Sequence, residues 1–132
     1  MTNQPITDFS TLPPIMAVDF DGTLVADAFP AIGRELAPMC KLVRELHSRG
    51  VKVILWTSRT GEHLENAINW CKEHNIPLDA VNQNIPEVIE LTGYDTRKVF
   101  ADVYVDDKSC PAKVLELRQF SNLDEKWQEK LA

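Results

Sequence analysis

The sequence predicts an α/β protein in which a central parallel sheet is covered by helices on both faces, forming a three-layer sandwich. Short apolar runs with strand character alternate with longer segments whose apolar residues recur at helical spacing. Polar clusters follow three of the four apolar runs, and sheets of this kind bind ligands at the carboxyl ends of their strands. The length of 132 residues suits one domain, which we assign to residues 15–132 after a flexible lead-in of residues 1–14.

The first predicted strand covers residues 15–20. It begins with Ile15-Met16-Ala17-Val18, an apolar run typical of a strand buried on both faces. Residues 25–37, in contrast, show no clear period and contain Pro30 and Gly33, which indicates a loop or flap beside the end of this strand.

The same two patterns predict the rest of the chain. Helices are expected where apolar residues share one face between a proline or polar start and a glycine or asparagine stop. Strands are expected at the short apolar runs between these helices. In chain order we expect a helix at 38–49, a strand at 51–56, a helix at 62–74, a weaker strand at 79–82, a short helix at 86–93, a strand at 101–105, and helices at 109–117 and 122–131.

Composition excludes several classes of protein. The formal net charge of -6 argues against a surface that coats nucleic acid, and no apolar stretch is long enough to span a membrane. Cys40, Cys71 and Cys110 are far apart and lack Cys-x-x-Cys spacing, as expected for reduced thiols. The polar start of the chain has no signal-peptide core. We therefore expect a soluble, cytoplasmic protein without a membrane partner, and the charge disfavours a nucleic-acid partner.

Acidic residues at the predicted strand ends indicate a cation site. Asp19 and Asp21 are two positions apart in an extended segment, so both side chains point to one side, and Asp106-Asp107 follow the last strand. Carboxylates held this close raise a pKa or require a counter-charge. Mg²⁺ is the expected ion, because it binds through a few carboxylates and retains water or substrate phosphate as further ligands. The plainer alternatives are an acidic turn at Asp21-Gly22 and a turn at Asp106-Asp107 into the next helix.

These motifs resemble those of the haloacid dehalogenase superfamily of phosphotransferases. The opening string Asp19-x-Asp21-Gly22-Thr23 matches the first motif, Thr57 the second, Lys98 the third, and Asp106-Asp107 the fourth. All four occur in the expected order, and the resemblance covers about residues 15–115. It implies a Rossmann-like fold of the small, capless type, since neither interval between the motifs has room for a separate cap domain.

The resemblance implies a Mg²⁺-dependent phosphohydrolase. Asp19 is then the nucleophile that forms an aspartyl-phosphate, and Asp21 is the general acid and base. The Mg²⁺ ligands are expected from Asp19, the backbone carbonyl of Asp21, Asp106 and Asp107, with the direct ligand of the last pair left open.

The phosphoryl oxygens are expected to contact Thr57, Ser58 and Lys98. Thr57 has the alternative of a β-branched strand terminus, and Arg97 is an alternative to Lys98. Further substrate contacts are expected from three residues, for which ordinary structural roles remain open, namely Thr23, Phe29 and Arg59.

An open, capless site suits a large phosphorylated substrate, or a neighbouring subunit of a homo-oligomer that supplies a lid. Two other functions remain open. One is a phosphatase acting on nucleic-acid ends, which the acidic composition disfavours. The other is a non-catalytic phosphate-binding or phospho-receiver module, against which the placement of Asp21 beside Asp19 argues.

Overall fold

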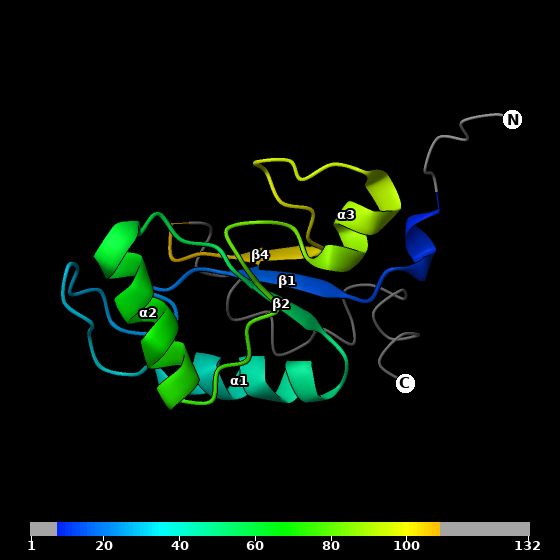
Figure 1. The fold of residues 1–132 in the computed structure, drawn as a ribbon. Helices are drawn as coiled ribbons and strands as arrows, with labels where there is room; N and C mark the ends of the chain where they lie inside the picture. The colour runs from blue at the N-terminus through cyan, green and yellow to red at the C-terminus, as the bar shows by residue number, and fades with distance from the viewer. Residues whose placement is uncertain (1–7, 109–132) are drawn as a thin grey trace, which may run out of the picture.

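A computed structural model of the chain, drawn in Figure 1, describes residues 8–108. Helices and strands alternate along this part of the chain after a short 3-10 turn. The elements are η1 (Phe9–Thr11), β1 (Ile15–Val18), α1 (Ala37–Ser48), β2 (Lys52–Leu55), α2 (Gly61–Glu73), β3 (Ala80–Val81), α3 (Pro86–Thr92) and β4 (Val103–Val105).

The predicted α/β sandwich with a parallel sheet is confirmed. Each strand and helix expected between residues 15 and 105 is present, although the strands are shorter than predicted at one or both ends. The helices expected at 109–117 and 122–131 lie outside the described residues. Among the described helices, none has the length and apolar character needed to cross a lipid bilayer.

The sheet has the strand order β3-β2-β1-β4, and all three pairings are parallel. β1 is central, with Val18 opposite Leu55 of β2 and opposite Val105 of β4. The chain leaves β1 toward β2 and β3 on one side and returns to β4 on the other side. This reversal of strand order creates a crevice at the carboxyl end of β1, which is the usual place for a ligand site.

Two apolar cores lie on opposite faces of the sheet, because alternate residues of β1 point to opposite sides. Met16 and Val18 belong to the core that includes residues of α1 and α2, whereas Ile15 and Ala17 belong to the core that includes Val88 of α3. Figure 1 shows α1 and α3 on opposite sides of the sheet. Because β1 is buried on both faces, the segment that follows it is held on a rigid base.

The segment expected to form a flap is an excursion whose two ends are joined. The Ala26 N–H donates to the Arg34 carbonyl at 2.8 Å, and the Leu36 N–H donates to the Leu24 carbonyl at 2.8 Å. Gly33 is required at this neck, because a Cβ there would overlap the Ala26 carbonyl. Figure 1 shows the excursion beside α2, at the end of the sheet where β1 finishes.

Candidate functional site

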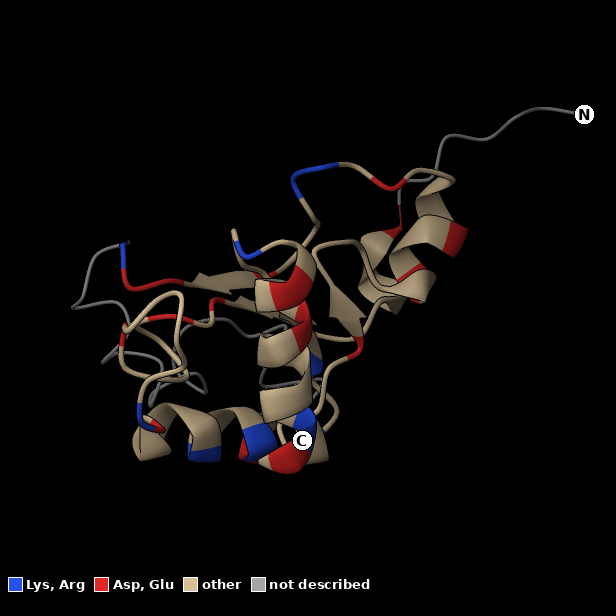
Figure 2. Ribbon diagram, turned by 60° about the vertical axis from the view of Figure 1, so that its left-hand side comes forward, with Lys and Arg blue, Asp and Glu red and all other residues tan. Residues whose placement is uncertain are grey.

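Three carboxylates come together at the carboxyl ends of β1 and β4. Asp19 follows β1, and Asp106 and Asp107 follow β4 directly. One oxygen from each of these three side chains lies within 4.8 Å of the other two. The Asp19 N–H donates to the Val105 carbonyl at 2.9 Å, so the parallel pairing of β1 with β4 continues to the site and sets this approach. Figure 2 shows acidic positions on the segments that extend from the strands on the left of the view.

Negative charge dominates the electrostatics of this cluster. Burial, together with the nearby carboxylates of Asp106, Asp107 and Asp21, raises the pKa of Asp19 from 3.8 to about 6. The Phe20 N–H, which donates to Asp19 Oδ1 at 2.7 Å, opposes this rise. Ionised Asp19 therefore needs a counter-charge.

Gly22 allows the turn after β1 to pass directly against Asp107. Its φ of +83° lies in the left-handed region, and a Cβ at this position would overlap the Asp107 carboxylate. The Gly22 N–H donates to the Val25 carbonyl at 2.7 Å, which closes the turn. A glycine is therefore needed both for the turn and for the placement of Asp107.

Asp21 is held by Arg59, which lies shortly after β2. Arg59 Nε donates to Asp21 Oδ2 and Nη2 donates to Oδ1, both at 2.7 Å. The side chain of Arg59 is 1% exposed and that of Asp21 is 17% exposed. This contact is a bidentate, largely buried ion pair, the strongest geometry available to an arginine and a carboxylate.

A cavity of about 510 Å³ lies over the acidic cluster. The second predicted motif borders it, with Thr57 fixed by its N–H, which donates to Asn82 Oδ1 at 2.8 Å. Thr57 Oγ1 accepts the Arg59 N–H at 3.1 Å. The lining residues are Asp19, Asp21, Asp27, Phe29, Trp56, Thr57, Ser58, Asn82, Asp106, Asp107 and Lys108.

Most of the predicted site residues meet at this cavity, but three do not line it. Thr23 is 6% exposed, and its hydroxyl has no hydrogen-bond partner among residues 8–108. Arg59 is buried behind Asp21 rather than placed for a substrate. Lys98 is exposed, and its Nζ lies 5.7 Å from the centre of the Tyr104 ring. The structure therefore places Thr23 and Arg59 as packing and ion-pair residues rather than as open substrate contacts.

Four lining residues were not predicted, namely Asp27, Trp56, Asn82 and Lys108. Trp56 directly follows β2 and Asn82 directly follows β3, so the rule that ligands bind at strand ends applies to them as well. Lys108 comes next to the acidic pair in sequence. Asp27 belongs to the flap, whose path the sequence pattern does not define.

The fold and the site define an α/β protein with an acidic cavity at the carboxyl ends of a parallel sheet. No protein-family model and no curated protein matches the chain. A solved structure, that of a conserved protein coded by a locus from Bacteroides thetaiotaomicron, is similar, with 34% sequence identity and a TM-score of 0.69. The match covers 82% of this chain and 91% of that one. The chain therefore belongs to the same family as this Bacteroides protein.

Proposed function

We propose that the protein is a Mg²⁺-dependent phosphohydrolase that acts through an aspartyl-phosphate on Asp19. The observation that carries the proposal is the meeting of Asp19, Asp106 and Asp107 within 4.8 Å, with Asp21 and Thr57 on the same cavity. The order of the motifs along the chain, which resembles that of the haloacid dehalogenase superfamily, supports the same function.

The donor set fits Mg²⁺. All of the clustered ligand atoms are carboxylate oxygens, the donors that this hard cation prefers, and within residues 8–108 neither histidine nor cysteine lines the cavity. The raised pKa of Asp19, which results from burial and from the nearby carboxylates of Asp106, Asp107 and Asp21, is a second indication. When bound, Mg²⁺ would neutralise the negative charge that otherwise keeps the phosphate away from the carboxylates.

The chain's own residues would divide the reaction between them. An oxygen of Asp19 attacks phosphorus, the bond to the leaving oxygen breaks, and Asp21 supplies the proton to that oxygen. Water then attacks the phosphorus of the aspartyl-phosphate and passes its proton to Asp21, which releases phosphate and restores Asp19. Thr57 and Ser58 border the cavity beside these groups and would contact the phosphoryl oxygens.

Two lysines are candidates for the side-chain cation that would contact the phosphate. Lys98 is the candidate from the motif order, and Lys108 is a second one because it lines the cavity. The Nζ of Lys108 lies 3.8 Å from Asp107 Oδ2, and its side chain is 81% exposed. Comparing Lys98→Met with Lys108→Met decides between them, since only the true phosphate partner should lower kcat on every ester.

The test is the release of phosphate from para-nitrophenyl phosphate, with Mg²⁺ and with EDTA. We expect turnover by the wild type only with Mg²⁺, and turnover below one hundredth of that rate for Asp19→Asn, because the nucleophile is lost. Glu90→Gln, which removes an exposed carboxylate on α3, serves as the matched control. Full activity of Asp19→Asn would show that the nucleophile is wrongly assigned.

A non-catalytic phosphate-binding or receiver module is the second candidate. The observation that favours it is the pairing of both Asp21 oxygens with Arg59, which keeps this carboxylate engaged. Incubation with acetyl phosphate and Mg²⁺ distinguishes the two functions. A receiver would accumulate a stable label on Asp19 that hydroxylamine removes, whereas a hydrolase would lose the label by turnover.

A further inference from the structure

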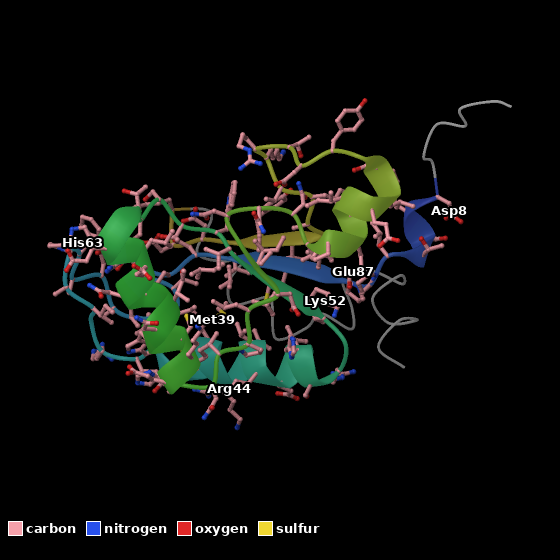
Figure 3. All side chains as sticks on the ribbon, in the orientation of Figure 1. Asp8, Met39, Arg44, Lys52, His63 and Glu87 are labelled. Carbon is pink, nitrogen blue, oxygen red and sulfur yellow. The ribbon has the colours of Figure 1, made fainter. Side chains whose placement is uncertain are left out.

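Arg59 connects three parts of the chain that lie apart in sequence. Its Nη1 donates to the Pro30 carbonyl at 3.3 Å and to the His63 carbonyl at 3.1 Å, and its Nη2 donates to the Ala31 carbonyl at 2.9 Å. Together with the two bonds to Asp21, these contacts join the end of β1, the flap and the first turn of α2. Figure 3 shows His63 on α2, on the side where the flap lies.

The guanidinium is also packed between aromatic rings. Its central carbon lies 5.1 Å from the centre of the Phe20 ring and 5.0 Å from that of Phe29, both within the range of cation–π contacts. The Phe29 ring in turn contacts the His63 ring edge to face, with centres 5.4 Å apart. A buried arginine with this surrounding has one orientation, and its rigidity extends to the carboxylate that it binds.

All five N–H donors of Arg59 are directed at protein acceptors: Asp21 accepts two, and Pro30, Ala31 and His63 accept one each. The guanidinium thus has no donor left over for a substrate phosphate. Asp21, however, borders the cavity, and each of its oxygens keeps a further lone pair beyond the one that Arg59 occupies.

We propose that Arg59 is a positioning residue, which fixes the Asp21 carboxylate and the flap in one arrangement so that Asp21 can exchange a proton with the leaving oxygen. This inference rests on the proposed function and assigns a role that the motif order does not. Asp21 remains the catalytic residue, and Arg59 acts only through it. A small rotation of the carboxylate would then cost rate at the step in which the leaving oxygen takes up its proton.

The test uses para-substituted phenyl phosphates, which are alike in size but differ in the basicity of the leaving oxygen. A basic leaving oxygen needs a proton as it departs, whereas a weakly basic one such as para-nitrophenolate needs little help. We expect Arg59→Lys to lower kcat/KM by roughly 10²-fold more for the most basic leaving group than for para-nitrophenolate. Arg49→Lys, at an exposed arginine that follows α1 and does not line the cavity, is the matched control and should leave this dependence unchanged.

A double-mutant cycle removes the ambiguity of a general structural effect. In the Asp21→Asn background, Arg59→Lys should have no further effect on the dependence on leaving group, because the residue that it positions is already gone. Addition of guanidinium ion to Arg59→Ala should restore part of the activity on the basic leaving groups.

Two results would overturn the inference. The first is an equal loss for all phenyl phosphates in Arg59→Lys, and the second is additive effects in the cycle. If the Arg59 variants fail to fold, NMR of the wild type decides, since the Arg59 Nε–H should exchange slowly and shift in Asp21→Asn. A rapidly exchanging or unshifted resonance would reject the fixed pair. Retained activity in Asp19→Asn would instead reject the proposed function itself.

Discussion

Asp19 is a carboxylate whose ionisation the folded structure disfavours. Burial and three neighbouring carboxylates raise its pKa to about 6, whereas an unfolded chain ionises it near 3.8. The folded protein therefore binds the Asp19 proton more tightly than the unfolded chain does. By linkage, this contribution to the free energy of unfolding is fully present below pH 3.8 and is lost as the pH rises toward 6.

A prediction follows for the protein without metal. Asp19→Asn should raise the free energy of unfolding at pH 7 by about 1–3 kcal/mol and should have little effect at pH 4, because the neutral amide avoids the cost of ionisation. Urea unfolding at the two pH values in EDTA measures this. Equal effects of the substitution at both pH values would contradict the assignment of the cost to Asp19.

Mg²⁺ should oppose this difference in stability between the wild type and Asp19→Asn. We expect Mg²⁺ to raise the melting temperature of the wild type at pH 7 but not that of Asp19→Asn, because a ligand stabilises the state that binds it. Thermal unfolding over a Mg²⁺ titration tests this, with Ca²⁺ as a comparison ion. An unchanged wild-type melting temperature would argue against a metal at the three carboxylates.

Gly22 supports a second prediction at the residue scale. Gly22→Ala should destabilise the fold by about 1–3 kcal/mol and reduce activity strongly, since the methyl group meets Asp107 and the left-handed φ is strained. Gly50→Ala is the control, because its φ is also positive, at +104°, but a Cβ there has open space around it. A similar loss of activity in both variants would show that backbone strain alone, without the contact to Asp107, explains the effect of Gly22→Ala.

The site could be predicted only in part from the residues. Asp19, Asp106 and Asp107 follow buried strands, and parallel pairing must bring such positions to one edge of the sheet. The pairing of Asp21 with Arg59 could not be predicted, because it depends on how a long side chain crosses from the end of β2 to the end of β1. Lys98 follows a loop whose path no sequence period determines.

At the scale of elements, the flap contributes an exposed aromatic side chain to the cavity. Phe29 is 54% exposed and borders the cavity, while the neighbouring carbonyls of Pro30 and Ala31 are bound by Arg59. The flap thus presents an apolar ring from a fixed backbone. We expect this ring to contact the leaving group of a bound phosphate ester.

Phe29→Ala should change the preference among phosphate esters more than it changes activity on para-nitrophenyl phosphate. The reason is that the ring is expected to contact the leaving group rather than the phosphoryl group. Comparing kcat/KM across a panel of sugar, nucleotide and aryl phosphates measures this, with Tyr94→Ala as a control at an exposed tyrosine away from the cavity. An equal loss on all substrates would refute the role.

The helices and strands themselves were largely predictable, because the spacing of apolar residues agrees with the positions of the prolines and glycines that start and end these elements. Proline starts α3, and Gly93, with φ of +80°, ends it. The strand ends were less predictable, as β4 shows. Asp102 Oδ2 accepts the Ile15 N–H at 2.8 Å, so a side chain forms part of the pairing that a longer strand would make with its backbone.

At the scale of the whole molecule, charged residues are arranged differently at the two ends of the sheet. At the end opposite the cavity, Lys52 Nζ lies 3.6 Å from Glu87 Oε2, and both residues are marked in Figure 3. Asp79 in the same region accepts the Val53 N–H at 2.7 Å. Asp79 and Glu87 at this end thus have local partners, whereas Asp19, Asp106 and Asp107 at the cavity end converge on one another.

The thiols of one core give a prediction for the whole molecule. Burial raises the pKa of Cys40 to about 11 and that of Cys71 to about 12, so neither forms a reactive thiolate at neutral pH. We expect iodoacetamide to alkylate both thiols only in globally unfolded molecules. The alkylation rate should therefore rise in urea in proportion to the unfolded fraction. Peptide mapping by mass spectrometry measures each site, and rapid labelling in buffer would indicate local opening of this core.

The joined neck of the flap has a consequence for redesign. Because hydrogen bonds between Ala26 and Arg34 and between Leu36 and Leu24 close the excursion at its base, its tip can lengthen at a small entropic cost without moving the sheet. New residues would belong in the exposed stretch between Asp27 and Phe29, ahead of the carbonyls that Arg59 holds. The molecule thus contains a natural graft point, at which a library of inserted loops could vary the surface beside the cavity while the sheet and the acidic cluster stay unchanged.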